Sequence, residues 1–198
     1  MLKIIKENTT NSSWHIRETI QIVTAVILVN NWQMLSIEER KAARDVFNEG
    51  MLDAKPEVQN LAKVGMTAYL VFKPIEELNT LSSAYVKNCN AYAEREKKRR
   101  KADTVAAALE KPEKPYITTI MMSACMILSF PYDLPQYTPG LLHAFLRHIS
   151  VPSLKDTVTK TTQDFKRTHQ DRWDEFKHRF SSEQLEGLQG AGAMSYYS

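Results

Sequence analysis

Apolar residues recur along this chain at intervals of three and four, which is the spacing of one face of an α-helix. The first such stretch opens near Trp14, and its inward face is predicted to hold Ile16, Ile20, Val23 and Ile27. Further aliphatic residues beside them predict a helix that is buried on most of its surface.

Capping residues and prolines mark the predicted helix boundaries. Ser36 and Glu39 have the spacing of a capping box, and Gly50 is suited to end the helix that follows them. Other helices are predicted to begin at or just after four prolines, which are Pro56, Pro74, Pro115 and Pro139. The chain is therefore predicted to be all-α.

A long C-terminal helix is predicted to begin at Ser153. Its inward face would be formed by Leu154, Val158, Thr161, Phe165, His169, Trp173, Phe176 and Phe180. This unbroken spacing predicts one straight helix of about 27 residues, roughly 40 Å long. Ser181 and Gln184 can then cap a final turn before Gly187.

Helix pairs recur at intervals of about 40 to 60 residues, close to the period of helical-hairpin arrays. They begin near Ser13, Pro56, Pro115 and Ser153. We interpret the chain as a HEAT/ARM-like α-solenoid segment, and we expect further repeats in front of the first pair. The predicted parts are an N-terminal flank over residues 1–11, a helical repeat domain over 12–186, and a flexible tail over 187–198.

The tail combines features of a peptide ligand. A spacer with three glycines and no charge leads to Tyr196, Tyr197 and Ser198, so we expect a flexible end. The terminal carboxylate can be captured as an anion, and the two tyrosines offer aromatic surface and hydroxyl groups. Because most chain ends are simply solvated, an inert end is the alternative.

Charge and hydropathy limit the classes of partner. The net charge is +3, which excludes the strong global field of a dedicated nucleic-acid binder. The longest apolar run, residues 20–29, is about half the length that crosses a bilayer, so no membrane segment is expected.

One stretch is nevertheless locally basic, within a predicted connector over about 94–114. It is either a solvated helix end or a nuclear-import or polyanion-binding patch formed by Lys97, Lys98, Arg99, Arg100 and Lys101.

Catalytic and metal-binding motifs are missing from the sequence. It has neither a phosphate-binding Gly-x-x-x-x-Gly-Lys-Ser/Thr loop nor a Gly-x-Ser-x-Gly elbow. His143 and His148 lack a carboxylate at ligand spacing, so we predict surface or packing roles for them, and a core role for His169. Cys89 and Cys125 are too far apart for a Cys-x-x-Cys pair and fit a reducing compartment. The sequence predicts no enzyme, no cofactor and no bound metal.

Three longer motifs carry a family resemblance. They are residues 12–17 (Ser-Ser-Trp-His-Ile-Arg), residues 129–135 (Ser-Phe-Pro-Tyr-Asp-Leu-Pro) and residues 165–173 (Phe-Lys-Arg-Thr-His-Gln-Asp-Arg-Trp). Together with the final tripeptide, they resemble the C-terminal region of the large HEAT-repeat proteasome activator family, proteasome activator complex subunit four. The motifs follow the family's order and span nearly the whole chain.

The resemblance implies a function for the tail. In that family, a long ATP-independent α-solenoid caps the 20S proteasome core particle, and a C-terminal hydrophobic-Tyr-any motif inserts between subunits of its α-ring. By this resemblance, the Ser198 carboxylate would pair with a pocket lysine, while Tyr196 and Tyr197 would fill the pocket and help to open the gate. The family ends more often in Tyr-Tyr-Ala. Because such an activator is far longer than 198 residues, the chain resembles a C-terminal fragment.

The resemblance also implies cellular associations. Family members are linked to the nucleus and cytoplasm, to ubiquitin-independent degradation, to DNA repair and to acetylated histones, which we expect to be bound by regions upstream of this chain. This interpretation involves neither a membrane nor direct nucleic-acid contact. The alternative is a nuclear HEAT-repeat scaffold, or a nucleic-acid- or chromatin-associated module, that acts through the basic patch at residues 97–101.

Overall fold

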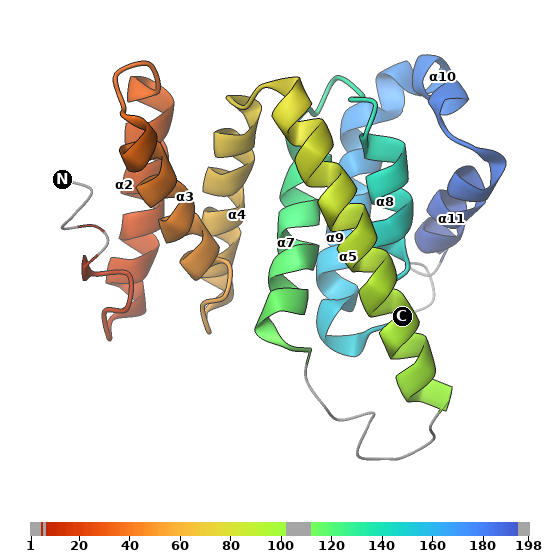
Figure 1. Ribbon diagram of the computed structural model, residues 1–198, viewed down its shortest axis with the longest axis horizontal. Coiled ribbons are helices and arrows are strands. Elements are labelled where there is room, and N and C mark those ends of the chain that lie inside the picture. The colour runs from red at the N-terminus through yellow and green to blue at the C-terminus, as the bar shows by residue number, and fades with distance from the viewer. Residues whose placement is uncertain (1–4, 6, 102–111, 194–198) are drawn as a thin grey trace. The chain divides into compact units, whose positions relative to one another are not determined.

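A computed structural model describes residue 5, residues 7–101 and residues 112–193 of the chain (Figure 1). The chain divides into two compact units, with the boundary between Pro74 and Ile75. Within the described residues, helices are the only regular secondary structure, which confirms the predicted all-α class. In each unit the helices pack against one another, which is consistent with the predicted solenoid-like fold.

Unit 1 contains α2 (Trp14–Asn31), α3 (Ile37–Gly50) and α4 (Pro56–Val71). The Glu39 backbone N–H donates to Ser36 Oγ at 3.2 Å, and the Ser36 backbone N–H donates to the Glu39 carboxylate at 2.9 Å. The predicted capping box is thereby confirmed. Helix α4 packs against both α2 and α3, and the three helices share one core.

Two glycines allow close packing in this core. A Cβ atom at Gly65 of α4 would lie 2.3 Å from the ring of Phe47, and one at Gly50 would lie 2.6 Å from the Gln21 side chain. Neither distance is sterically tolerated. The fully buried Phe47 ring therefore rests directly on the α4 backbone.

The exposure of α2 differs from the sequence interpretation. Its buried residues are Ile20, Gln21, Thr24 and Leu28, whereas Ile16 and Val23 are 44% and 38% exposed. The expectation of a largely buried helix is wrong because α3 and α4 cover a face that includes two polar residues. The free energy cost of burying the polar Gln21 side chain is offset in part by a hydrogen bond that its Nε2 donates to the Val46 carbonyl at 3.4 Å. The exposed aliphatic residues of this helix are Ile16, Ile22, Val23, Val26 and Val29.

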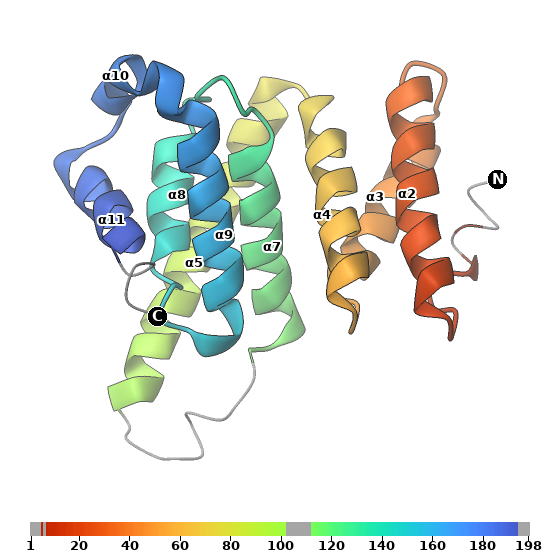
Figure 2. The ribbon, with the colours of Figure 1, turned by 180° about the vertical axis from the view of Figure 1, so that it is seen from behind.

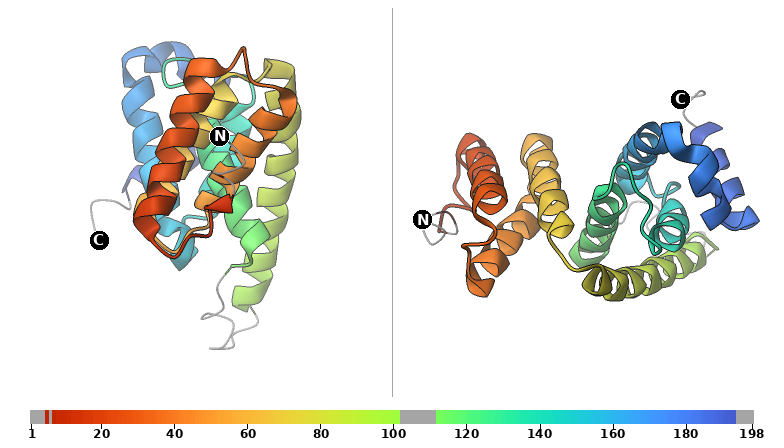
Figure 3. Two further views of the ribbon diagram at one scale, coloured as in Figure 1. Left: turned by 90° about the vertical axis from the view of Figure 1, so that its left-hand side faces the viewer. Right: turned by 90° about the horizontal axis from the view of Figure 1, so that it is seen from above.

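Unit 2 is built from α5 (Ile75–Lys101), α7 (Lys114–Leu128), α8 (Thr138–Leu146), α9 (Pro152–His169) and α11 (Ser182–Ala193). Helix α7 lies side by side with α9 and also contacts α5 and α8 (Figure 2). Helix α11 packs against α8 and α9 at the blue end of the chain (Figure 3). Large residues buried between these helices include Leu78, Ile120, Met126, Phe145, Leu154 and Phe165.

The predicted long C-terminal helix is interrupted. Helix α9 ends at His169, and the chain continues through η1 (Gln170–Arg172), α10 (Trp173–Phe176) and η2 (Lys177–Arg179). The predicted inward positions are buried, apart from Trp173, which is half-buried. The spacing therefore identified the inward face, but the prediction of one straight helix was wrong.

Contacts with a loop explain the interruption. His169 Nε2 donates to the Asp133 carbonyl at 3.0 Å, Arg172 donates to the Tyr132 carbonyl at 3.1 Å, and Arg179 donates to the Leu134 carbonyl at 2.6 Å. These three consecutive carbonyls belong to the proline-flanked loop after α7. In a straight helix, His169, Arg172 and Arg179 would be too far apart along the axis to reach one short loop. Hydrogen bonds from all three side chains to the loop carbonyls therefore favour short helical turns that bend around the loop.

The glycine-rich spacer also differs from the expectation of flexibility. Helix α11 extends through Ala193, and Ser181 and Gln184 cap its start reciprocally at 3.3 Å and 2.9 Å, as predicted. Residues 187–193 are therefore helical, because Leu188 and Ala191 bury apolar surface that offsets the low helix propensity of glycine. The basic stretch 94–101 belongs to α5 and not to a loop, while residues 102–111 of the predicted connector lie outside the described residues.

Candidate functional site

The predicted docking residues Tyr196, Tyr197 and Ser198 lie outside the described residues. The structure does describe the helix that leads to them. Helix α11 is fixed to the body of unit 2 by Leu188, which is 3% exposed, and by packing on α8 and α9. The chain therefore leaves the described part of unit 2 at a defined point, Ala193.

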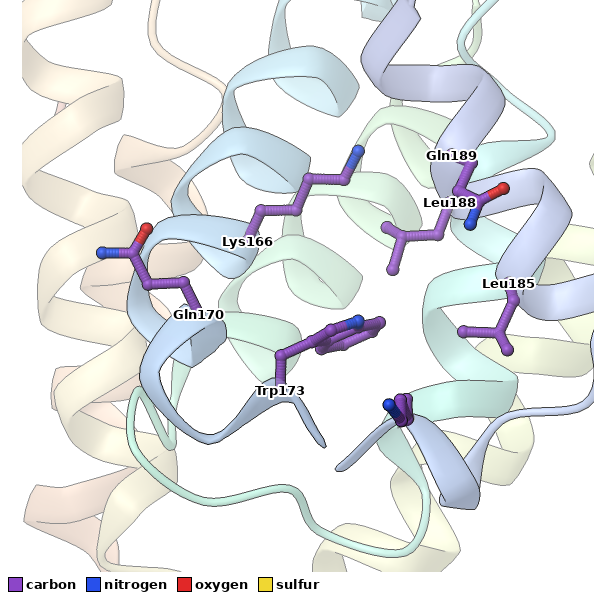
Figure 4. Close-up of a pocket in the computed structure, with 7 residues that line it drawn as sticks. Lys166, Gln170, Trp173, Leu185, Leu188 and Gln189 are labelled. Carbon is purple, nitrogen blue, oxygen red and sulfur yellow. The ribbon is translucent and has the colours of Figure 1, made fainter. Parts of the chain in front are cut away.

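A pocket of about 420 Å³ lies between the α9–α10 segment and α11 (Figure 4). Lys166, Trp173, Leu185 and Leu188 point toward the space between these segments, whereas Gln170 points away from it. The volume and the mainly apolar lining are typical of ligand sites. The lining residues are Lys166, Gln170, Trp173, Lys177, Leu185, Leu188 and Gln189.

The charges that line this pocket are both positive. Partial burial lowers the pKa of Lys166, which has no carboxylate partner within the described part of the chain. Lys177 is instead paired with Asp174 at 2.5 Å, and that hydrogen bond lowers the pKa of the Asp174 carboxyl. Lys166 is thus a half-buried cation beside an apolar cavity. The spacing of apolar residues in the sequence did not predict this pocket, because the pocket forms only where the chain bends after α9.

A second groove, of about 500 Å³, lies beside the basic end of α5. Two residues of the predicted basic patch, Lys97 and Arg100, line it together with Arg147 from the turn after α8. The fold thus adds a third cation from a distant part of the sequence. Glu96 lines the same groove and reduces its net positive charge.

Several basic side chains near this groove are engaged within unit 2. Arg99 pairs with Glu96 at 2.9 Å, and Arg100 donates to the Ser150 carbonyl at 2.5 Å. Arg147 hydrogen-bonds to Glu94 at 2.5 Å and thereby lowers the pKa of that carboxyl. The basic run therefore anchors α5 to the turn before α9. The side chain of Lys101 lies outside the described residues.

The candidate histidines have packing roles, as predicted. His148 is fully buried with Nδ1 2.6 Å from the Tyr116 hydroxyl, and His169 stacks on Phe165. His143 is partly exposed beside Glu183, 3.7 Å away. These contacts place His148 and His169 in the core of unit 2 and His143 near its surface.

Cys89 and Cys125 are both buried, and neither forms a disulfide. Burial raises the pKa of Cys89 to about 11, and its Sγ lies 3.6 Å from Ser123 Oγ. Such a thiol is a poor nucleophile at neutral pH. Among the described residues, no group of three or more His, Cys, Asp or Glu side chains could hold a metal ion. None of the described helices is long and apolar enough to cross a membrane.

Comparison with known proteins places these features in a family context. Residues 116–198 match the family model described as "Proteasome activator complex subunit 4-like, C-terminal". Proteasome activator complex subunit 4 of Homo sapiens is 28% identical over 191 residues, which cover 93% of this chain and 10% of that protein. The chain is related to the C-terminal region of proteasome activator complex subunit 4. The resemblance inferred from the sequence motifs is thereby confirmed.

The relationship extends beyond vertebrates. Proteasome activator complex subunit 4A of Danio rerio is 29% identical over 193 residues, covering 93% of this chain and 10% of that protein. Proteasome activator subunit 4 of Arabidopsis thaliana is 22% identical over 198 residues, covering 100% of this chain and 11% of that protein. The chain thus spans about one tenth of the length of these curated relatives.

Proposed function

We propose that this chain is a non-catalytic, ATP-independent proteasome activator module that docks Tyr196, Tyr197 and Ser198 into the α-ring of the 20S core particle and promotes gate opening. The observation that supports this most directly is the family match, which runs from residue 116 to residue 198 and so includes the tail. Helix α11 adds a mechanical basis, because a packed helix presents the following residues from a fixed point.

The proposed ligand has three parts. The Ser198 carboxylate supplies a charge for a lysine of the α-ring, and the two tyrosine rings supply apolar area. A short ligand of this kind gains affinity from further contacts of the protein that carries it. We therefore expect this chain alone to bind the core particle with a Kd in the micromolar range or weaker.

The test is stimulation of fluorogenic peptide cleavage by purified core particles, with binding measured in parallel. Tyr197→Ala, deletion of Ser198 and amidation of the terminus should each abolish binding and stimulation. Tyr197→Phe should weaken binding by about 1–3 kcal/mol if the hydroxyl has a buried partner in the α-ring.

Tyr132→Ala is the matched control, because Tyr132 is 74% exposed in unit 2 and makes no proposed contact with the core particle. This variant should bind and stimulate as the parent does. Unchanged stimulation after both amidation and Tyr197→Ala would refute docking through the tail.

The groove formed by Lys97, Arg100 and Arg147 supports a second candidate, a nuclear scaffold or nucleic-acid- or chromatin-associated module. Binding of DNA through three cations should weaken with salt, with a log–log slope of about −2 to −3, and should be insensitive to loss of the last three residues. Salt-independent or tail-dependent DNA binding would contradict it. The activator module is proposed to act in the nucleus and cytoplasm, with acetylated histones bound by regions upstream, whereas the second candidate would act in the nucleus.

A further inference from the structure

We propose that the pocket between α9, α10 and α11 binds the chain's own C-terminal Tyr-Tyr-Ser, so that unit 2 stores the tail when no α-ring is bound. The inference depends on the proposed function for its biological consequence, but its binding step is independent of the proteasome. Three observations support it: the chemistry of the lining, the position of α11, and the length of the chain that follows.

The lining complements an aromatic carboxylate. Trp173, Leu185 and Leu188 offer apolar surface, and the indole of Trp173 faces α11 across the cavity (Figure 4). The charged side chains in the lining are Lys166 and Lys177, and the lining contains no carboxylate. The side chain of Lys166 reaches toward α11, where an anion would neutralise a half-buried cation.

The pocket's own wall leads to the tail. Leu188 and Gln189 lie on α11, and Leu188 is five residues before Ala193, or about 7.5 Å along the helix axis at the α-helical rise. Tyr196 and Tyr197 follow Ala193 by three and four residues, which allows a span of up to about 10 to 14 Å. The tail is therefore long enough to turn back to the level of Leu188.

Attachment makes weak binding sufficient. A ligand on a short tether has an effective concentration in the millimolar range, so a Kd of about 1 mM would fill the pocket for a large part of the time. The pocket and the α-ring would use the same carboxylate and rings, so the two sites would compete for the tail. Storage would then reduce the fraction of chains that are free to dock.

The first experiment measures the pocket without the proteasome. The receptor is the full chain with Tyr196→Ala and Tyr197→Ala, and the probes are acetyl-Ser-Tyr-Tyr-Ser with a free carboxylate and its C-terminal amide. The Trp173 indole N–H signal, assigned with Trp173→Phe, reports binding in NMR titrations. The acid peptide should bind with a Kd of about 1 mM or lower, and the amide should bind at least five-fold more weakly.

Lys166 provides the charge-specific test. Lys166→Met should remove the preference for the acid peptide, because it deletes the charge but retains an unbranched apolar stem. Lys160→Met is the matched control, since Lys160 is exposed on the same helix and does not line the pocket. Equal binding of acid and amide peptides by the receptor, or loss of the preference in Lys160→Met, would overturn the assignment.

The unaltered chain tests whether the tail binds in cis. It should bind the acid peptide about two-fold or more weakly than the receptor, and its Trp173 signal should differ from the receptor's at every protein concentration. Equal peptide affinity of the unaltered chain and the receptor would overturn storage of the tail. A Trp173 signal that changes with protein concentration would also overturn it, because the tail would then be bound by a second copy of the chain.

With core particles, Lys166→Met in the unaltered chain should raise α-ring affinity by about two- to ten-fold. A failure of α-ring binding in every variant would contradict the proposed function and leave the peptide result intact. Unchanged α-ring affinity in Lys166→Met, with binding otherwise intact, would overturn the competition.

Discussion

His148 is predicted to make unit 2 sensitive to acid. Its side chain is fully buried, Nδ1 lies 2.6 Å from the Tyr116 hydroxyl, and the two rings meet edge to face with centroids 5.3 Å apart. Burial lowers the pKa of His148 from 6.5 to about 4, and the neighbouring Arg147 charge acts in the same direction. The folded protein therefore holds this imidazole neutral at pH values where an unfolded chain would protonate it.

The direction follows from proton linkage. Between pH 6.5 and about 4 the unfolded state binds the additional proton, so stability falls as the pH falls through this window. Each unit of pKa difference corresponds to about 1.4 kcal/mol, which gives about 3 kcal/mol over the whole window and about 2 kcal/mol between pH 7 and pH 5. Most unperturbed carboxylates remain ionised over this narrower interval.

The assay is urea denaturation at pH 7 and pH 5, followed by the fluorescence of Trp173. Replacing Trp14 and Trp32 with phenylalanine leaves Trp173 as the one tryptophan, and it reports on unit 2. In this background, His148→Asn removes the titrating ring while keeping an amide near the position of Nδ1. We expect a loss of stability at both pH values from the smaller side chain, but a pH-dependent loss about 2 kcal/mol smaller than in the parent.

Tyr116→Phe is the control, because it deletes the hydroxyl partner and leaves the buried imidazole in place. It should lower stability at both pH values by about 1–3 kcal/mol and retain the acid sensitivity. If the parent and His148→Asn lose the same stability between pH 7 and pH 5, His148 is not held neutral by burial, and the reasoning fails.

Three other predictions concern single residues. Asp53→Asn should reduce the loss of folding stability below about pH 4. A hydrogen bond from Arg17 lowers the pKa of Asp53, and the stabilisation from this pair is lost as the pH falls through that lowered pKa. Equal acid-induced losses of stability in the parent and the variant, measured by urea titration, would contradict this. Gly65→Ala should destabilise unit 1 by about 1–3 kcal/mol, because the new Cβ would lie 2.3 Å from an aromatic ring. Gly140→Ala should instead stabilise α8 by about 0.5–1 kcal/mol, because no other atom lies near the position of its Cβ. Thermal denaturation checks this pair, and a raised Tm for Gly65→Ala would refute the packing argument. Cys89, whose pKa burial raises to about 11, should resist alkylation at pH 8 until urea is added, as measured by peptide mass spectrometry; rapid native labelling would show that the thiol is accessible.

Local sequence signals determined the helices and several of their boundaries. The Ser36 and Ser181 caps form as predicted, because each serine and its partner three residues later interact within one turn. Pro74 separates α4 from α5 because proline cannot continue a helix. The family resemblance was also available from short motifs, since it depends on residue identities and not on packing.

Contacts between distant residues decided the rest. The spacing of apolar residues predicted Val23 of α2 to be buried, but α3 and α4 cover the face that includes Gln21 and Thr24. Aliphatic residues occupy much of the circumference of α2, so periodicity alone could not select the covered side. Similarly, the apolar spacing after Ser153 was consistent with one straight helix, because it records which residues are buried but not the direction of the chain between them.

The candidate sites show the same division. The sequence alone identified the terminal tripeptide and the basic run, because both are contiguous. Only the tertiary structure brings Arg147 beside Lys97, and places Lys166 and Trp173 opposite α11. The first juxtaposition depends on the packing of α5 against α8. The second depends on hydrogen bonds from His169 and Arg179 to the carbonyls of a loop more than thirty residues earlier in the chain. A local pattern contains no information about such contacts, because their free energy depends on both partners being in place.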